Sequence, residues 1–127
     1  KAFDLNLEVA IQPENAVETV VSRSNFKYMY WSMAQQLAHH TINGCRVNSG
    51  DMMGSGTISG PTEDSFGSML ELSWGGQKPL KMNDGSERKF INDNDTVIIR
   101  GFCQKDNLRI GFGEVSSKLL PAVELKF

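Results

Sequence analysis

Length, charge and cysteine content limit what this chain can be. Its 127 residues are enough for one domain with a modest core. Thirteen basic and fifteen acidic residues give a net charge of −2 without long charged blocks, so we expect no binding to nucleic acid or to an anionic membrane. The sequence shows no signal-peptide pattern and no apolar run of membrane-spanning length. With only two cysteines, which we expect to be free and buried, the chain is typical of a soluble cytoplasmic protein.

The first elements are predicted to be two strands. Apolar and polar residues alternate over 3–11, a period of two that is typical of a strand with one buried face. Residues 12–15 contain Pro and Asn and break the pattern. The short apolar run at 18–22 predicts a second strand that returns antiparallel to the first.

One main helix is predicted at about 25–42. Ser24 or Asn25 can cap its N-terminus, and the Asn-Gly pair at 43–44 is a common C-terminal cap. Its opposite sides are both apolar, so we expect it to be covered on more than one face. The pattern leaves open whether a second layer or a second subunit covers it. The apolar residues at helical spacing are Phe26, Met29, Tyr30, Met33 and Leu37.

The remaining sequence predicts strands and turns. We expect turns at 83–85 and 105–107, where Asn, Asp and Gly gather. No repeat or linker interrupts the order, which predicts a single α+β unit dominated by mixed or antiparallel sheet. The candidate strands are 51–59, 69–74, 78–81, 88–91, 96–104 and 108–112.

Thr57 and Glu71 are the candidate functional residues, predicted on consecutive strands. Three glycines surround Thr57 within 54–60, which a strand tolerates where a ligand or another chain approaches closely. Glu71 lies inside the apolar run 69–72, where a buried carboxylate needs a donor or a cation. The alternatives are structural: Thr57 as an ordinary strand residue, and Glu71 as the partner of a core Arg or Lys. Ser55 and Ser59 are weaker candidates, as turn and sheet residues.

Metal binding by residues of this chain is not expected. His39 and His40 are neighbours on the predicted helix, whereas a shared ion needs ligands three or four positions apart. The acidic stretch 93–95 lacks the Gly and the distal Glu of a calcium loop and is more typical of a turn.

Several motifs follow one another in a fixed order, at 24–31, 35–37, 39–40, 43–45, 54–61, 66–74, 109–113 and 119–121. Together they resemble the C-terminal part of the fumarylacetoacetase family, hydrolases that split fumarylacetoacetate in tyrosine breakdown. The resemblance extends over nearly all of the chain beyond about residue 20. It implies a layered β-rich fold, with 1–127 as the C-terminal part of a catalytic domain whose upstream segments are absent.

The resemblance also implies roles for both candidate residues. Glu71 would orient a histidine that activates the attacking water, and Thr57 would hold the substrate. That histidine, and the carboxylates that bind Ca²⁺ or Mg²⁺, belong to upstream segments that this chain lacks. The implied enzyme is a homodimer acting on a small-molecule substrate, and the isolated chain is expected to be inactive.

The implied reaction converts fumarylacetoacetate and water to fumarate and acetoacetate, the last step of tyrosine and phenylalanine catabolism. Two alternatives stay open. One is hydrolysis of a related acylpyruvate-type diketone, because Thr57 and Glu71 alone do not define the substrate. The other is a non-catalytic fragment that serves assembly.

Overall fold

The computed structural model describes residues 3–124, which form one antiparallel sheet, a small hairpin and a few short helices. This content confirms the predicted α+β class. The elements in chain order are β1 (Asn6–Gln12), β2 (Thr19–Asn25), the 3-10 helix η1 (Phe26–Tyr28), α1 (Met33–Thr41), the 3-10 helix η2 (Glu63–Ser65), α2 (Met69–Leu72), β3 (Leu80–Lys81), β4 (Glu87–Arg88), β5 (Thr96–Lys105) and β6 (Leu108–Lys118).

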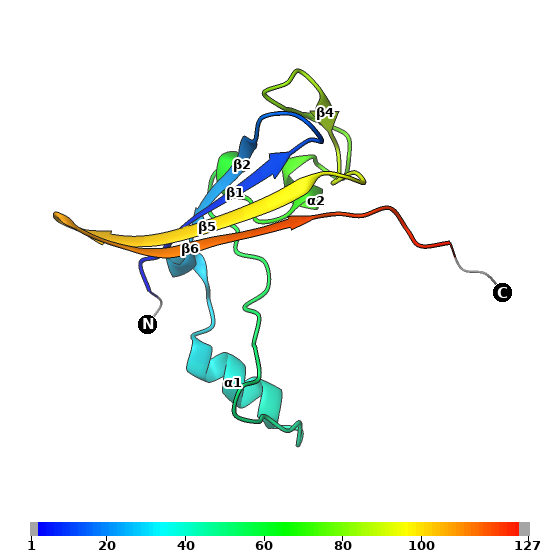
Figure 1. Cartoon of the computed structure of the whole chain (residues 1–127). Helices are drawn as coiled ribbons and strands as arrows, with labels where there is room; N and C mark the ends of the chain where they lie inside the picture. Colours follow the sequence, from blue (N-terminus) through cyan, green and yellow to red (C-terminus); the bar gives the residue numbers. More distant parts are fainter. Residues whose placement is uncertain (1–2, 125–127) are drawn as a thin grey trace.

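The main sheet has the strand order β2-β1-β5-β6, and every neighbouring pair is antiparallel. The strands predicted at 3–11, 18–22 and 96–104 are confirmed as β1, β2 and β5, whereas β6 is longer than the predicted 108–112. Figure 1 shows the β5–β6 hairpin reaching beyond the ends of β1 and β2. Asp106 adopts a φ of 51° in the turn of this hairpin, as the short polar connection requires.

One face of the sheet is polar. Glu8 of β1 lies opposite Arg100 of β5, and Arg100 lies opposite Glu114 of β6. The guanidinium of Arg100 bonds Glu114 at 2.7 Å and Glu18 at 2.8 Å, and Glu8 also pairs with Arg23 at 3.2 Å. These cross-strand pairs fix the register of three strands on this face.

The other face of the sheet is apolar and forms the core with α2. Ile11 is among the most deeply buried side chains, and Val9 and Ile11 line a cavity of about 300 Å³ together with residues around α2. The alternation predicted for 3–11 is therefore confirmed, and it places the apolar residues toward the layer that carries α2. The lining residues from that layer include Phe66, Met69 and Leu72.

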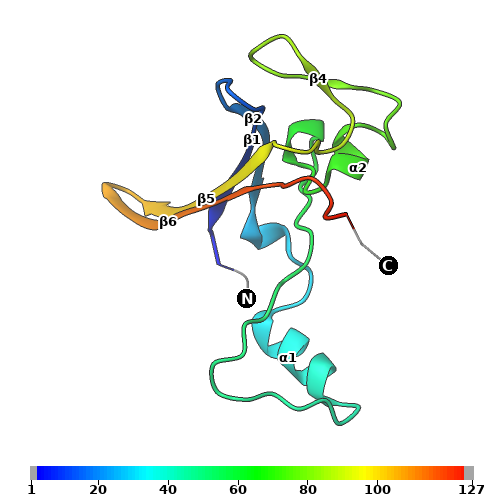
Figure 2. The same cartoon turned by 45° about the vertical axis from the view of Figure 1, so that its right-hand side comes forward.

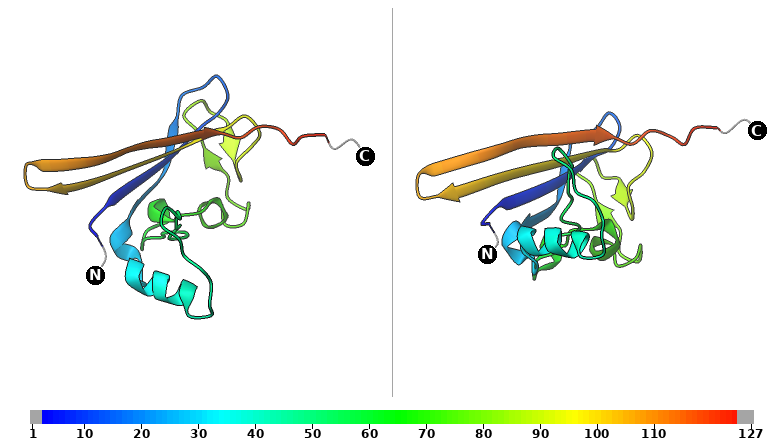
Figure 3. Two further views of the ribbon diagram at one scale, coloured as in Figure 1. Left: turned by 60° about the horizontal axis from the view of Figure 1, so that its bottom comes forward. Right: turned by 90° about the horizontal axis from the view of Figure 1, so that it is seen from below.

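The helix predicted at 25–42 is wrong in its extent. Asn25 caps only the three residues of η1, after which Met29 becomes extended with a ψ of 125°. A capping box between Ser32 and Gln35 then starts α1. None of the α1 side chains is buried, which differs from the expected burial on more than one face. Figures 1 and 2 show the helix standing away from the sheet, and Figure 3 gives two further views of the same arrangement.

Two predicted strands are absent from the described residues. Residues 51–59 form an irregular loop, and the residues predicted as a strand at 69–74 instead form α2 and a following turn. Ser68 caps α2 by accepting a hydrogen bond from the backbone N–H of Glu71. Local capping therefore decides the structure of this apolar run, which is too short for its periodicity to distinguish helix from strand.

The small sheet formed by β3 and β4 confirms the turn predicted at 83–85 and places Arg88 next to the main sheet. Gly85 has a φ of 86° in this turn, a conformation that favours glycine. Arg88 forms two hydrogen bonds with Asp95, from Nε at 2.7 Å and from Nη2 at 2.8 Å. Asp95 is 1% exposed, so it is a structural ion-pair partner within the predicted turn at 93–95.

The cysteines are free, as predicted, but neither is buried. Cys45 is exposed in the loop after α1, and Cys103 is half-buried on β5. No helix among residues 3–124 has the length and apolar character needed to cross a membrane.

Candidate functional site

Glu71 is held by hydroxyl groups from two separate segments. Ser59 Oγ donates to both carboxylate oxygens, at 2.8 and 2.9 Å, and Ser68 Oγ donates to Oε2 at 2.7 Å. These bonds, with Ser68 contributing most, keep the pKa of the Glu71 carboxyl below its usual value, despite partial burial. Glu71 is therefore ionised at neutral pH.

The structure differs from the predicted strand position of Glu71 and from its predicted burial. It lies on α2 rather than on a strand, and its side chain is half-buried rather than buried. Among the described residues it has no salt-bridge partner, so the alternative of a carboxylate paired with a core Arg or Lys is not supported there. Its charge is stabilised by neutral donors instead.

Thr57 lies in the irregular loop, where its side chain is exposed. Gly56 has a φ of 77°, so the chain bends at this point in a conformation that favours glycine. At Gly67 an added Cβ would meet the backbone oxygen of Ile58 at 2.5 Å and Thr57 Cγ2 at 2.8 Å. Glycine at 67 therefore lets the loop pass directly over the segment that enters α2.

This close approach brings Thr57 and Glu71 into one pocket. It is a shallow cavity of about 560 Å³ lined by the loop, by α2 and by the segment that follows η1. Tyr30 and Trp31 pack edge to face, with ring centroids 4.8 Å apart, and contribute aromatic surface to it. The remaining lining residues are Tyr28, Met29, Ile58, Ser59, Ser68 and Leu70.

The chemical character of the pocket follows from its lining. Among the described residues that line the pocket, Glu71 is the one with a formal charge at neutral pH, and it lies beside hydroxyl groups and aromatic rings. A fixed carboxylate of this kind can accept a hydrogen bond from an imidazole and stabilise the imidazolium form. The Thr57 hydroxyl can donate to a carboxylate or keto oxygen of a ligand.

Ser59 and Ser68 are site residues that the sequence alone does not single out. The sequence predicts Ser59 only as a weaker candidate and gives no prediction for Ser68. The spacing Ser68-x-x-Glu71 is the signature of a helix N-terminus, and it could have identified both the short helix and the serine that contacts the carboxylate. Ser59 is adjacent to Glu71 only through the fold, because it lies in a separate segment.

The histidines lie elsewhere. His39 and His40 line a second pocket, of about 600 Å³, between α1 and Met53. Within residues 3–124, no three His, Cys, Asp or Glu side chains gather in a group that could hold a metal ion. The residues of this region therefore do not fit a metal centre by themselves.

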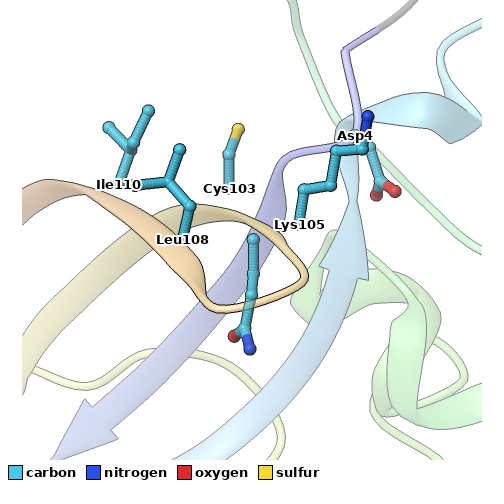
Figure 4. A pocket seen from close by; sticks show the side chains of 6 residues that line it. Asp4, Cys103, Lys105, Leu108 and Ile110 are labelled. Carbon is cyan, nitrogen blue, oxygen red and sulfur yellow. The ribbon is translucent and has the colours of Figure 1, made fainter.

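A further hollow lies at the β5–β6 hairpin, away from Thr57 and Glu71. It measures about 240 Å³, and Figure 4 shows Cys103, Lys105, Leu108 and Ile110 on the hairpin with Asp4 beside them. Its exposed lining is predominantly apolar. No hydrogen bond or ion pair in the described region organises these side chains around a common point, so it is a weaker candidate site than the Glu71 pocket.

The family of the chain is decided by sequence comparison. The family model for the C-terminal region of fumarylacetoacetate (FAA) hydrolase matches residues 2–119. The chain belongs to the fumarylacetoacetate hydrolase family. The resemblance stated from the motifs is thereby confirmed.

Named relatives support the same assignment. The chain is 54% identical to the fumarylacetoacetase of Homo sapiens over 122 residues, which cover 95% of the chain and 29% of the relative. It is 55% identical to the Caenorhabditis elegans fumarylacetoacetase, covering 94% of the chain and 29% of the relative. For the Arabidopsis thaliana fumarylacetoacetase the identity is 46%, with 94% and 28% covered. The chain thus spans less than a third of the length of these relatives.

Proposed function

We propose that this chain is the C-terminal portion of a fumarylacetoacetase, which is active when joined to the rest of the parent enzyme. The proposed reaction is hydrolysis of a carbon–carbon bond in fumarylacetoacetate to give fumarate and acetoacetate, in tyrosine and phenylalanine catabolism. The observation that carries the proposal is the shared pocket of Thr57 and Glu71 in a chain 54% identical to a named fumarylacetoacetase.

Glu71 would act through a histidine supplied by another segment of the parent. Its carboxylate accepts the N–H of one ring nitrogen, which leaves the other nitrogen free to take a proton from water. The water oxygen bonds to the carbonyl carbon that becomes the fumarate carboxylate, and the bond to the acetoacetate carbon breaks. The acetoacetate carbon leaves as an enolate and gains the proton that the imidazole took from water. The second water proton is released to solvent when the new carboxyl group ionises, so atoms and charge balance.

Thr57 would hold the substrate in the same pocket. Its hydroxyl donates a hydrogen bond to a carboxylate or keto oxygen in the ground state and in the transition state alike. Tyr30 and Trp31 provide flat apolar surface for the conjugated part of such a substrate.

The proposal also includes the cofactor and the assembly of the parent enzyme. We propose Ca²⁺ or Mg²⁺ as cofactor, with oxygen ligands from segments outside this chain, since residues 3–124 contain no suitable group. The parent is proposed to be a cytoplasmic homodimer with the layered β-rich fold of its family. The exposed apolar side chains Met33, Leu37 and Trp31 support burial of the α1 side against further protein.

The two alternatives make different predictions. An acylpyruvate-type hydrolase would keep the roles of Thr57 and Glu71 but prefer a diketone with a shorter or differently charged acyl group. A non-catalytic assembly fragment is favoured only by the exposed apolar surface around α1. Comparing turnover of several diketo acids by the full-length parent distinguishes all three.

The main test replaces Glu71 in the full-length parent enzyme. Glu71→Gln should lower kcat for fumarylacetoacetate by roughly a hundredfold or more with the fold retained, because glutamine cannot stabilise an imidazolium. Glu63→Gln is the matched control, since Glu63 is an exposed acid on η2 outside the pocket. If turnover by Glu71→Gln stays within about twofold of wild type, Glu71 is structural and the proposed role is wrong.

The isolated chain gives a complementary test. We expect no hydrolysis of fumarylacetoacetate by the 127-residue chain, because Glu71 has no histidine of the required motif to orient. Metal-dependent turnover by the purified chain would contradict this division of roles between segments.

A further inference from the structure

The two serines that bond Glu71 come from segments that are separate in the sequence. Ser59 belongs to the loop that carries Thr57, and Ser68 caps α2. Ser59 Oγ lies 2.8 and 2.9 Å from the two carboxylate oxygens, and Ser68 Oγ lies 2.7 Å from Oε2. Together they fix the carboxylate from two directions.

Backbone groups in turn fix the direction of each hydroxyl. The N–H of Gly67 donates to Ser59 Oγ at 3.1 Å, and the N–H of Glu71 donates to Ser68 Oγ at 3.3 Å. A serine hydroxyl has one proton to donate. Since each oxygen already accepts from the backbone, its proton is free to point at the carboxylate.

No described residue that lines this pocket is a lysine, an arginine or a histidine. The other titratable side chains that line it are Tyr28 and Tyr30. The serine hydroxyls are therefore the side-chain donors that stabilise the charge of Glu71 within the described region. Without them the half-buried carboxylate would keep its negative charge at a higher free-energy cost.

We propose that Ser59 and Ser68 are positioning residues that hold the Glu71 carboxylate ionised and oriented toward the pocket. The proposal rests on the proposed function, in which Glu71 orients a histidine from another segment.

The kinetic test uses the full-length parent enzyme. Ser59→Ala and Ser68→Ala should each lower kcat for fumarylacetoacetate by about tenfold while KM stays within about twofold. Ser59→Thr and Ser68→Thr keep a hydroxyl and should recover most of the lost kcat. Recovery by threonine also guards against the possibility that an alanine variant fails to fold.

Ser73→Ala is the matched control. Ser73 is fully buried at the end of the same helix, but its hydroxyl donates to the backbone oxygen of Met69 at 2.7 Å and does not contact Glu71. We expect Ser73→Ala to lower thermal stability and to leave kcat within about twofold.

A titration separates this inference from the proposed function, because it does not depend on activity. The Glu71 carboxyl signal is followed by carbon-13 NMR in full-length protein with labelled glutamate, and Glu71→Gln assigns the signal. Ser59→Ala and Ser68→Ala, or the threonine variants if alanine prevents folding, are compared with wild type and Ser73→Ala. Loss of a donor to the charged form should raise the pKa of Glu71.

The outcomes are distinct. A higher Glu71 pKa in the alanine variants, with wild-type values in the threonine variants and in Ser73→Ala, supports the inference. If wild-type parent does not hydrolyse fumarylacetoacetate, the proposed function fails while the titration still decides the role of the serines. An unchanged Glu71 pKa in both alanine variants, or kcat losses no larger than in Ser73→Ala, overturns the inference.

Discussion

The main sheet and the α1 segment, which we define as residues 29–58, are stabilised in different ways. In the sheet, cross-strand ion pairs around Arg100 hold one face, and apolar residues such as Ile11 pack against α2 on the other. Sequence-distant residues therefore support each other, as in the core of an independent domain.

The α1 segment depends on local contacts. Its helix has a capping box and no buried side chain, and Met33 and Leu37 are 57% and 42% exposed. Two pockets, of about 600 and 310 Å³, separate α1 from the nearby loop. Local capping alone gives only marginal stability to a helix of this length. The exposed apolar surface of α1 also needs further protein to cover it.

The candidate site lies where these two regions meet. Glu71 is on α2, which packs against the sheet, whereas Thr57 is in the loop of the α1 segment. In the proposed function, the catalytic carboxylate would therefore lie on the stable region and the substrate contact on the weaker one. Such a division is common, because binding residues often sit on loops that a rigid scaffold positions.

The largest expected effect is on the buried ion pair of the stable region. Asp95→Ala should lower the free energy of unfolding by about 3–5 kcal/mol, because it leaves the nearly buried Arg88 guanidinium, 12% exposed, without its partner. Denaturant unfolding measures this. Lys118→Ala is the control, since it breaks the exposed pair with Glu14 and should cost less than about 1 kcal/mol. Equal losses in the two variants would contradict the buried role of Asp95.

The same pair predicts a pH dependence of stability. Hydrogen bonds from Arg88 keep the pKa of Asp95 below its usual value, so the folded state favours the charged form. Its stabilisation is present above the unfolded pKa of about 3.9 and is lost as the pH falls through the lower folded value. Unfolding measured below about pH 4 should show a smaller difference between wild type and Asp95→Ala than at pH 7.

The sequence predicted the stable region better than the weaker one, for a physical reason. The alternation over 3–11 reflects burial of one sheet face, and the structure confirms it as β1. The run at 69–72 is only four residues long, so its apolar character indicates burial without distinguishing helix from strand. The prediction of one helix at 25–42 did not take account of a second capping residue, Ser32, at which α1 begins.

The site was predicted in part. The glycines around Thr57 and the isolated charge of Glu71 pointed to both residues, and the structure brings them into one pocket, although their roles remain predictions. Contact between Ser59 and Glu71 could not be read from the sequence because it depends on the loop crossing Gly67. No local pattern encodes that crossing.

A smaller effect is expected at the loop side of the pocket. In the full-length parent, Thr57→Val should raise KM for fumarylacetoacetate by about tenfold and change kcat by less than about twofold, because the hydroxyl binds substrate and transition state equally. Steady-state kinetics measures the two constants. Ser55→Ala is the control, since Ser55 Oγ donates to Gly56 O and does not line the Glu71 pocket. A lower kcat with an unchanged KM would contradict this prediction and would mean that the Thr57 hydroxyl contacts the substrate only in the transition state.

The smallest expected effect is local to α1 and tests the comparison most directly. Ser32→Ala removes the hydroxyl that accepts from the backbone N–H of Gln35 at 3.3 Å, which should cost about 1 kcal/mol of helix stability. Because no α1 side chain is buried, the loss should appear as about fivefold faster amide hydrogen exchange within α1, with β1 and β5 unchanged. Ser32→Asp retains a capping oxygen and should exchange at the wild-type rate. Faster exchange in β1 and β5 as well would show that α1 and the sheet unfold as one unit, so the two regions would no longer differ in how they are stabilised.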